Sequence, residues 1–285
     1  MRRIGWCAAV LLGVLATAAP VRAGWIIDEA TKGGGDDKSR QRLFLQANRL
    51  KTVSFEGTRT TEAMVMDLDA QTITHIDYKE RAYVTATAKE YGDMLRQGMQ
   101  AMGGEMQSAM QAQMKELEAQ LKNMPPDQRR AIEAMMKQNQ PKAAAPKPKA
   151  EDCAPDKVDI KSTGKRATVA GYDASGYQVF ANGKPDSEVY IAPAITAVRE
   201  LDPQKLEKMV SEMLKGFPQC PPRRGMIGAD PVWKLMKDGY PVRSIEKDGS
   251  TTEVTKAESR SIGAVEFQPP AGFARKTLQE MMGGK

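Results

Sequence analysis

Residues 87–138 read TAKEYGDMLRQGMQAMGGEMQSAMQAQMKELEAQLKNMPPDQRRAIEAMMKQ, and this methionine- and glutamine-rich stretch decides how the rest of the chain is interpreted. Thr87 and Glu90 have the spacing of a capping box, which predicts that a helix begins here. Apolar residues then recur every three or four positions and fall on one stripe. Gly103 is followed by a second glycine, which favours a break, and Pro125 ends the run. The stretch therefore predicts a helical segment over 87–138 that must dock its apolar side on something.

The apolar stripe is the candidate ligand-binding surface. Its members are Leu95, Met99, Met102, Met106, Met110, Met114, Leu117 and Leu121. Methionine is flexible and fills irregular space, so packing against a curved sheet is one use of the stripe. A groove for an acyl chain or a partner peptide is a second use. Copper(I) binding by thioethers is a third, but no other ligand type lies near in the sequence, so we predict no metal site.

Residues 1–23 have the pattern of a secretory signal peptide. Two arginines precede an apolar run that is too short for a stable membrane span, and small residues lead up to Ala23. We expect cleavage near Ala23 and a periplasmic product, with no transmembrane span in residues 24–285. Residues 1–23 hold three of the 42 basic residues and none of the 36 acidic ones, so the remaining net charge is +3. That charge is not typical of a nucleic-acid-binding domain, and we expect no nucleic acid partner.

Two cysteines remain after cleavage, Cys153 and Cys220. An oxidising compartment favours a disulfide between them. The bridge would close a loop of about 68 residues and stabilise the fold by roughly 4 kcal/mol on the chain-entropy estimate. Because the chain has no C-x-x-C motif, a structural role is the better interpretation.

The rest of the chain shows strand patterns on both sides of the helical segment. We predict a mobile lead at 24–42, a single domain at 43–285, and a Pro/Ala/Lys linker at 139–157 inside that domain. Asp202 has the position of an N-cap for a further helix, with Pro203 in its first turn. The predicted strands are 49–56, 58–69, 72–78, 82–85, 158–161, 165–171, 176–181, 187–192, 231–236, 240–247, 251–261 and 264–268.

Three stretches are familiar in combination: ITHIDYKERAYVTATAKEY at 73–91, the methionine-rich helix with MPPDQRRAIEAMM at 124–136, and GYPVRSI, TTEVTKAESRSI and EFQPPAGF between 239 and 273. Together they resemble an uncharacterised family of exported bacterial proteins of unknown function. That family is similar in architecture to the periplasmic lipoprotein carriers and receptors of the Lol pathway. The resemblance implies an α+β fold, a curved antiparallel β half-barrel with amphipathic helices packed on its concave face. No lipoprotein-binding residue of the carriers maps onto this sequence.

The sequence offers no catalytic constellation. His75 is the single histidine, and it lies on a predicted strand with Asp77 two residues on. A base needs both an orienting group and a nucleophile, so a surface or packing role is the better interpretation of His75. We therefore predict a non-enzymatic protein without a cofactor, which binds or carries a hydrophobic ligand such as a lipid, an acyl chain or a lipoprotein segment. The alternatives are a structural subunit that docks an envelope protein and, less favoured, copper(I) binding. A membrane surface is a further candidate partner.

Overall fold

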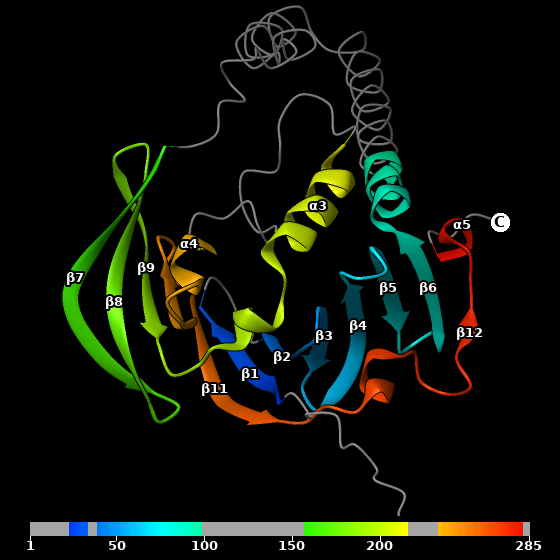
Figure 1. Ribbon diagram of the computed structural model, residues 1–285, viewed down its shortest axis with the longest axis horizontal. Coiled ribbons are helices and arrows are strands. Elements are labelled where there is room, and N and C mark those ends of the chain that lie inside the picture. Colours follow the sequence, from blue (N-terminus) through cyan, green and yellow to red (C-terminus); the bar gives the residue numbers. More distant parts are fainter. Residues whose placement is uncertain (1–22, 34–38, 99–156, 216–232, 282–285) are drawn as a thin grey trace, which may run out of the picture.

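The computed structural model describes residues 23–33, 39–98, 157–215 and 233–281 (Figure 1). Within these residues the chain forms one open, curved sheet of twelve strands in the order β12-β6-β5-β4-β3-β2-β1-β11-β10-β9-β8-β7. The strands are β1 (Gly24–Lys32), β2 (Ser39–Gln46), β3 (Arg49–Glu56), β4 (Arg59–Asp67), β5 (Thr72–Asp77), β6 (Ala82–Thr87), β7 (Val158–Val169), β8 (Tyr172–Ala181), β9 (Lys184–Ala192), β10 (Tyr240–Glu246), β11 (Thr251–Arg260) and β12 (Ala274–Arg275).

Neighbouring strands of the sheet run antiparallel, apart from the short parallel pair of β12 and β6. This confirms the predicted curved antiparallel sheet. Short helical elements accompany it: η2 (Ala197–Glu200), α3 (Pro203–Leu214), α4 (Trp233–Met236), η3 (Ala264–Phe267) and α5 (Leu278–Met281). Residues 88–98 are also helical. Among the described residues, no helix is long and apolar enough to cross a membrane.

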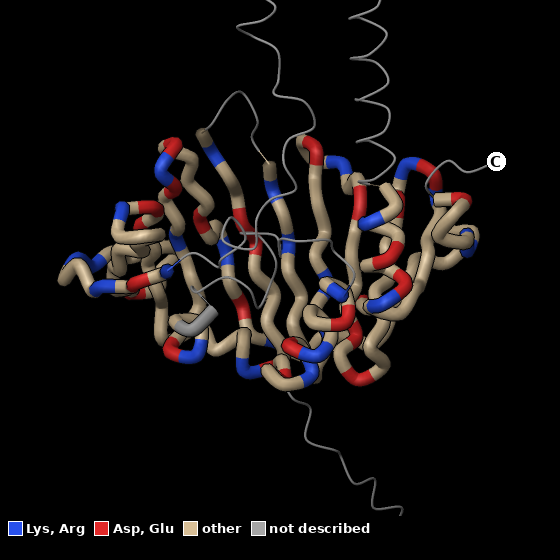
Figure 2. The backbone as a smooth tube through the Cα atoms, turned by 90° about the horizontal axis from the view of Figure 1, so that it is seen from above, with Lys and Arg blue, Asp and Glu red and all other residues tan. Residues whose placement is uncertain are grey.

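The two faces of β1–β6 bury different side chains, because successive residues of a strand point to opposite sides. One face, the helix-side face, packs residues such as Leu50 and Ile73 together with Leu206 of α3. The other face, the strap-side face, packs Phe44 and Ile76. Acidic and basic residues are interspersed along the strands and turns (Figure 2).

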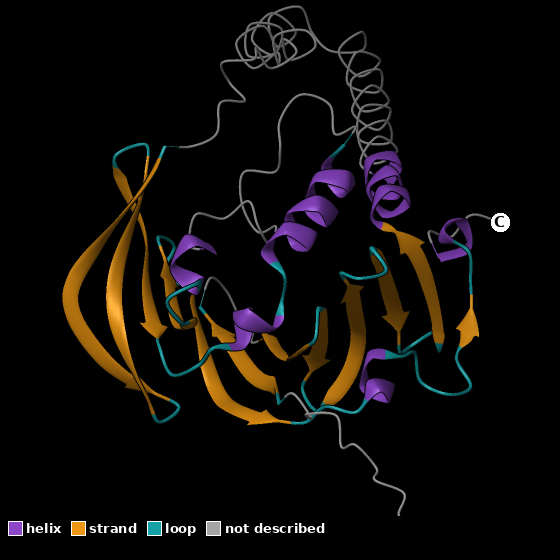
Figure 3. Cartoon of the chain, viewed as in Figure 1, coloured by secondary structure: helices purple, strands orange, loops and turns teal. Residues whose placement is uncertain are grey.

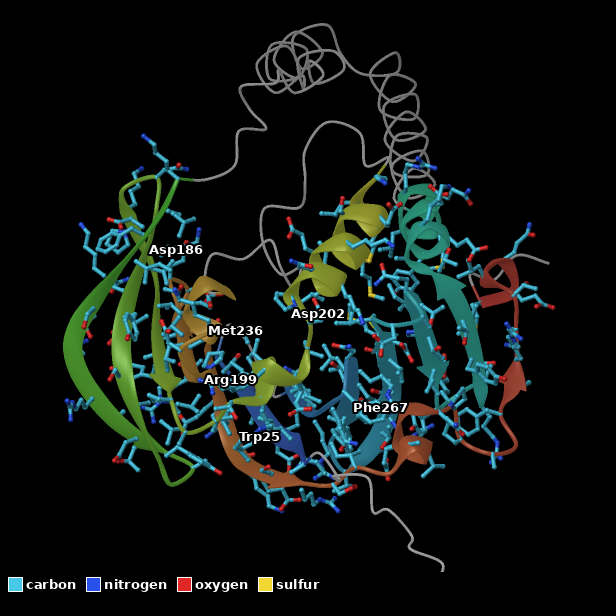
Figure 4. All side chains as sticks on the ribbon, in the orientation of Figure 1. Trp25, Asp186, Arg199, Asp202, Met236 and Phe267 are labelled. Carbon is cyan, nitrogen blue, oxygen red and sulfur yellow. The ribbon has the colours of Figure 1, made fainter. Side chains whose placement is uncertain are left out.

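Residues 261–281, here called the C-terminal strap, cover the strap-side face and then cross the β6 edge. Phe267 is buried in that face, and Lys51 Nζ donates to the Glu266 carbonyl oxygen at 2.7 Å. Figure 4 places Phe267 on η3, beside the sheet. β12 then pairs with β6, and Leu278 of α5 packs against the helix-side cluster. The strap therefore protects one edge of the sheet, where unpaired backbone groups would otherwise be open.

The predicted mobile lead at 24–42 is wrong over its described residues 24–33 and 39–42, because strands of the sheet begin before the predicted domain start at residue 43, whereas residues 34–38 lie outside the described ranges. Residues 24–32 form β1, which lies inside the sheet between β2 and β11. Ile27 is buried in the helix-side face and Ile26 in the strap-side face. A strand that is buried on both faces reads as a continuous apolar run, and here that run is only three residues long, from Trp25 to Ile27.

Two of the smaller strand predictions are also wrong. Residues 231–236 were expected to be extended, but Trp233–Met236 forms the helix α4. Residues 264–268 were expected to be extended, but Ala264–Phe267 forms the 3₁₀ helix η3. Both stretches hold few residues, and short apolar runs do not distinguish a strand from one helical turn. The hairpin turn predicted at 247–250 is confirmed, since Glu246 N donates to Ser250 O at 2.8 Å between β10 and β11.

Candidate functional site

The helix at 88–98 begins at the predicted capping box. The Glu90 carboxylate accepts from the Thr87 backbone N–H and from its hydroxyl, both at 2.8 Å. The Thr87 hydroxyl oxygen accepts in turn from the Glu90 backbone N–H at 3.2 Å. These reciprocal bonds lower the pKa of Glu90 and satisfy donors that the first helical turn leaves without partners. The helix therefore leaves β6 in a fixed direction.

The helix at 88–98 crosses α3 in close backbone contact at Gly92. A Cβ atom on Gly92 would overlap the carbonyl oxygen of Met213 and lie 2.8 Å from its carbonyl carbon. Close approach of two backbones requires a residue without a side chain at the crossing point. Tyr91 is buried beside this contact and joins the same apolar cluster as Met213.

A polar network anchors the beginning of α3 to the turns of the sheet. The Asp202 side chain accepts from the backbone N–H groups of Gln204 and Lys205, at 2.9 and 3.2 Å, which confirms it as the N-cap. Asn48, in the β2–β3 turn, accepts from Asp202 N at 2.8 Å and donates to Asp69 at 3.0 Å. Lys205 Nζ lies 2.5 Å from Asp69. Figure 4 labels Asp202 at the start of α3.

Methionine distinguishes the helix-side face from the strap-side face. In the described part of the chain, the helix-side cluster buries Met66, Met209 and Met213, and packs the partly buried Met64, Met94 and Met236 against them. The strap-side cluster, over the same described residues, contains phenylalanine and no methionine, although tyrosine and aliphatic residues occur in both clusters and Trp25 lies in the helix-side one. Methionine side chains adapt to irregular or changing neighbours, whereas aromatic rings fix one geometry. The helix-side face is therefore the better candidate for binding an apolar molecule.

A buried polar group interrupts the helix-side face. Glu29 of β1 is 8% exposed and accepts from Tyr240 Oη at 2.8 Å and from Gln41 Nε2 at 2.5 Å. Burial raises the pKa of Glu29 above the ordinary glutamate value, against the smaller opposing effect of these two hydrogen bonds. Burial, together with the adjacent Glu29, raises the pKa of Tyr240 well above the ordinary tyrosine value. The group therefore favours a neutral carboxyl and a neutral phenol.

Sequence reasoning did not identify Glu29 or Tyr240. A signal was present in the strand GWIIDEATK, where Trp25, Ile27 and Glu29 share one face by alternation. Once Trp25 and Ile27 are assigned to the core, a carboxylate at the next position of that face predicts a buried acid. That assignment was missed because the strand itself was not predicted.

One member of the predicted ligand-binding stripe lies in the described part of the chain. Leu95 is half-buried and packs against the helix-side cluster. The other seven members, Met99, Met102, Met106, Met110, Met114, Leu117 and Leu121, lie outside the described residues. Cys153 and Cys220 also lie outside them, so the disulfide stays a prediction.

The single histidine lies in β5, opposite Met64 of β4 and Val84 of β6. These neighbours are apolar, so the ladder brings no acid or nucleophile directly beside His75. Within the described ranges, no three His, Cys, Asp or Glu side chains gather as a metal site would require.

Comparisons with known proteins give a family and a set of distant structures. A family model described as Domain of unknown function (DUF4412) matches residues 83–273. No curated protein matches the chain. An uncharacterized conserved protein from Thermus thermophilus is 9% identical at a TM-score of 0.41, with 90% of this chain and 91% of that chain covered. The resemblance to an uncharacterised family is thus confirmed.

Two further solved structures match the chain at low identity. A Pseudomonas aeruginosa MucA/MucB complex includes a chain that is 11% identical at a TM-score of 0.35, with 88% of this chain and 57% of that chain covered. A LolA superfamily protein from Nitrosomonas europaea is 8% identical at a TM-score of 0.27, with 88% and 91% covered.

Proposed function

The chain belongs to the family described as Domain of unknown function (DUF4412), and we propose that it is a non-enzymatic protein of the bacterial cell envelope that holds a hydrophobic ligand. The ligand class is a lipid, an acyl chain or the lipid-modified segment of a lipoprotein. It lies against the helix-side face, between the curve of the sheet and the two helices. The predicted signal peptide supports the compartment.

The methionines of the helix-side face are the observation that carries this proposal. Met64, Met94 and Met236 are only partly buried, and they come from β4, from the helix at 88–98 and from α4. Flexible thioethers at the margin of a packed core can make room for a chain-like molecule at a lower packing cost than branched or aromatic residues. The position of α3 within the curve of the strands in Figure 3 supports a helical cover over the concave face.

Leu95 extends this surface along the helix at 88–98. It is half-buried against the cluster, whereas Gln97 on the same helix is exposed. The predicted stripe beyond residue 98 would continue the same apolar line. Burying about 400 Å² of ligand and protein apolar surface there would contribute roughly 10 kcal/mol before the costs of association.

The test combines native mass spectrometry with two matched variants. Residues 24–285, prepared gently from a periplasmic extract, should carry extra mass that organic extraction resolves as lipid. A fluorescent long-chain fatty acid should bind the wild type, should bind Leu95→Asp at least about tenfold more weakly, and should bind Gln97→Asp as it binds the wild type. Circular dichroism checks that both variants fold. If Leu95→Asp folds and keeps its affinity, the helix-side surface is not the ligand site.

A clean apoprotein mass together with absent fatty-acid binding would refute the ligand proposal. It would favour the alternative of a structural subunit whose helical segment docks an envelope protein. Crosslinking from position 97 in intact cells would then identify that partner.

A further inference from the structure

The backbone ladder between β10 and β11 is unusually short for the interior of this sheet. β11 pairs with β1 at nine positions, from Arg260 to Thr251, but with β10 at three, Glu253, Thr252 and Thr251. β10 pairs with β9 at six positions. Val254 and residues 256–260 of β11 therefore pair with β1 alone, and Thr255 lies at a bulge in that ladder. Between β10 and β11 the sheet divides into two parts, one of β7–β10 and one that contains β11 and β1–β6.

Two tyrosine hydroxyls bridge this seam where the ladder ends. Tyr240, the first residue of β10, reaches past β11 and donates to Glu29 of β1 at 2.8 Å. Tyr172, the first residue of β8, donates to the backbone carbonyl of Ala257 in β11 at 3.0 Å. Side-chain hydrogen bonds thus stand where further ladder bonds would otherwise hold the two parts together. A side-chain bond to a titratable group also depends on its charge, whereas a backbone ladder does not.

Two hydrogen bonds, from Gln41 and Tyr240, stabilise a negative charge on Glu29, but no cation faces it among the described residues. The side chains that face it are Gln41 from β2, Tyr240 from β10 and Val254 from β11, with Ile27 and Thr31 on its own strand. Tyr240 is the one titratable group in this set. Its phenol is neutral when protonated and negative when deprotonated, so it offers no positive charge to Glu29. Among the residues that the structure describes, Glu29 has no ion pair. A buried carboxylate without a cation is costly, whereas the neutral acid can accept from Tyr240 and donate to the Gln41 amide oxygen after an amide rotation.

We propose that the β10/β11 seam is a hinge and that Glu29 is its latch, closed when the carboxyl is protonated and opened when it ionises. In the open form Glu29 reaches water and the Tyr240 hydrogen bond is released. The part of the chain that contains β7–β10 then moves as one body about the three-position ladder, because its own ladders are longer.

The direction of the pH effect follows from the raised pKa. The closed form holds Glu29 with a pKa above the ordinary value, and the open form returns that pKa toward about 4.5. Between these two values the closed form binds more protons than the open form. Raising the pH through this window therefore favours opening, and lowering it favours closure. Arg243 and Glu253 also bridge the seam at 2.9 Å, but Glu253 is 41% exposed, so water screens its charge.

Opening at this seam would expose the helix-side cluster at Tyr190 and Val242, which β9 and β10 contribute. If the proposed function holds, the opened seam is the route by which the apolar ligand enters. Only this assignment of an entry route rests on the proposed function. The hinge itself requires no ligand. Its test therefore uses the ligand-free protein.

Hydrogen exchange read by mass spectrometry tests the hinge on residues 24–285 at pH 4.5, 6 and 7.5, with labelling times scaled for the chemical exchange rate. In the wild type, protection of peptides covering 240–246 and 251–260 should fall as the pH rises through the window, by at most about tenfold for each pH unit. Peptides covering 49–56 and 59–67 should keep their protection, which separates local opening from global unfolding.

Two glutamine variants complete the test. Glu29→Gln keeps the shape and the acceptor for Tyr240 but cannot ionise, so its seam peptides should stay protected at every pH. Glu253→Gln makes the same chemical change in the same seam at an exposed position, and its pH dependence should match the wild type. The proposal is overturned if Glu29→Gln retains the wild-type pH dependence, or if the wild-type loss of protection is equal across all strands. Neither result depends on whether the protein binds a fatty acid.

Discussion

Substitution of Gly92 by alanine should test whether the two helices are in close backbone contact. Gly92 faces the backbone of Met213 in α3, and an added Cβ would overlap the carbonyl oxygen and lie 3.0 Å from the Met213 Cα atom. Because these are backbone atoms, no side-chain rotation relieves the overlap. The helix at 88–98 would have to move away from α3, and the apolar contacts of Tyr91 and Met213 would loosen with it.

The magnitude follows from two opposing effects. Overpacking of a tight contact costs about 1–3 kcal/mol, and overlap with backbone belongs at the upper end of that range. Alanine gains about 1 kcal/mol over glycine in helix propensity. The net loss of unfolding free energy should therefore be roughly 2 kcal/mol, which lowers Tm by about 4–8 °C for a domain of this size.

Urea denaturation followed by circular dichroism, with a calorimetric scan for Tm, measures this loss. Gly98→Ala is the matched control, because a Cβ atom at Gly98 meets nothing within 4 Å on the same helix. That variant should gain up to about 1 kcal/mol in unfolding free energy. If Gly92→Ala is as stable as Gly98→Ala, the helices do not approach as closely as the structure requires, and the reasoning fails.

Three further substitutions have definite expected outcomes. Glu29→Gln should remove the fall in unfolding free energy that the wild type shows as pH rises from about 4.5 through the raised pKa of Glu29; urea titrations at several pH values measure this, and an unchanged slope would contradict it. Thr87→Ala should cost about 1 kcal/mol, because it breaks the reciprocal bonds with Glu90; equal stability to the wild type would show that the cap is not formed. Asn48→Ala should lower the unfolding free energy by roughly 2–3 kcal/mol, because it removes the hydrogen bond to Asp202 N and places alanine at a φ of 63°. Asn48→Gly also removes that hydrogen bond but tolerates the positive φ, so it should recover only the cost of the backbone conformation. Equal losses in the two variants would show that the positive φ is not strained.

The sequence predicted the elements whose signals are local. The capping box at Thr87, the N-cap at Asp202 and the hairpin turn at 247–250 each depend on residues within four positions of one another. Their hydrogen bonds form as predicted in the folded protein, because each donor and its acceptor are close along the chain. The alternation in β4 likewise predicted that Met64 and Met66 share a face, and both belong to the helix-side cluster.

The sequence missed features that arise from contacts between distant segments. β1 was interpreted as a mobile lead because its polar half, from Asp28 onward, is ordered by pairing with β11, more than 200 positions away. The buried pair of Glu29 and Tyr240 depends on the same long-range pairing. The difference between a methionine face and a phenylalanine face also needs the register of six strands and the path of the C-terminal strap.

The sequence by itself determined the class of this protein: an antiparallel sheet with short amphipathic helices, the start points of those helices, and membership of a family whose function is unknown. These follow from periodicity and from short-range hydrogen bonding, which the chain specifies residue by residue. The tertiary structure alone decided that Gly92 is a crossing point, that Glu29 is buried with no cation beside it among the described residues, and that the ladder between β10 and β11 is short. Each of these is a property of two or more segments brought together, because burial and pairing exist only once the sheet has formed.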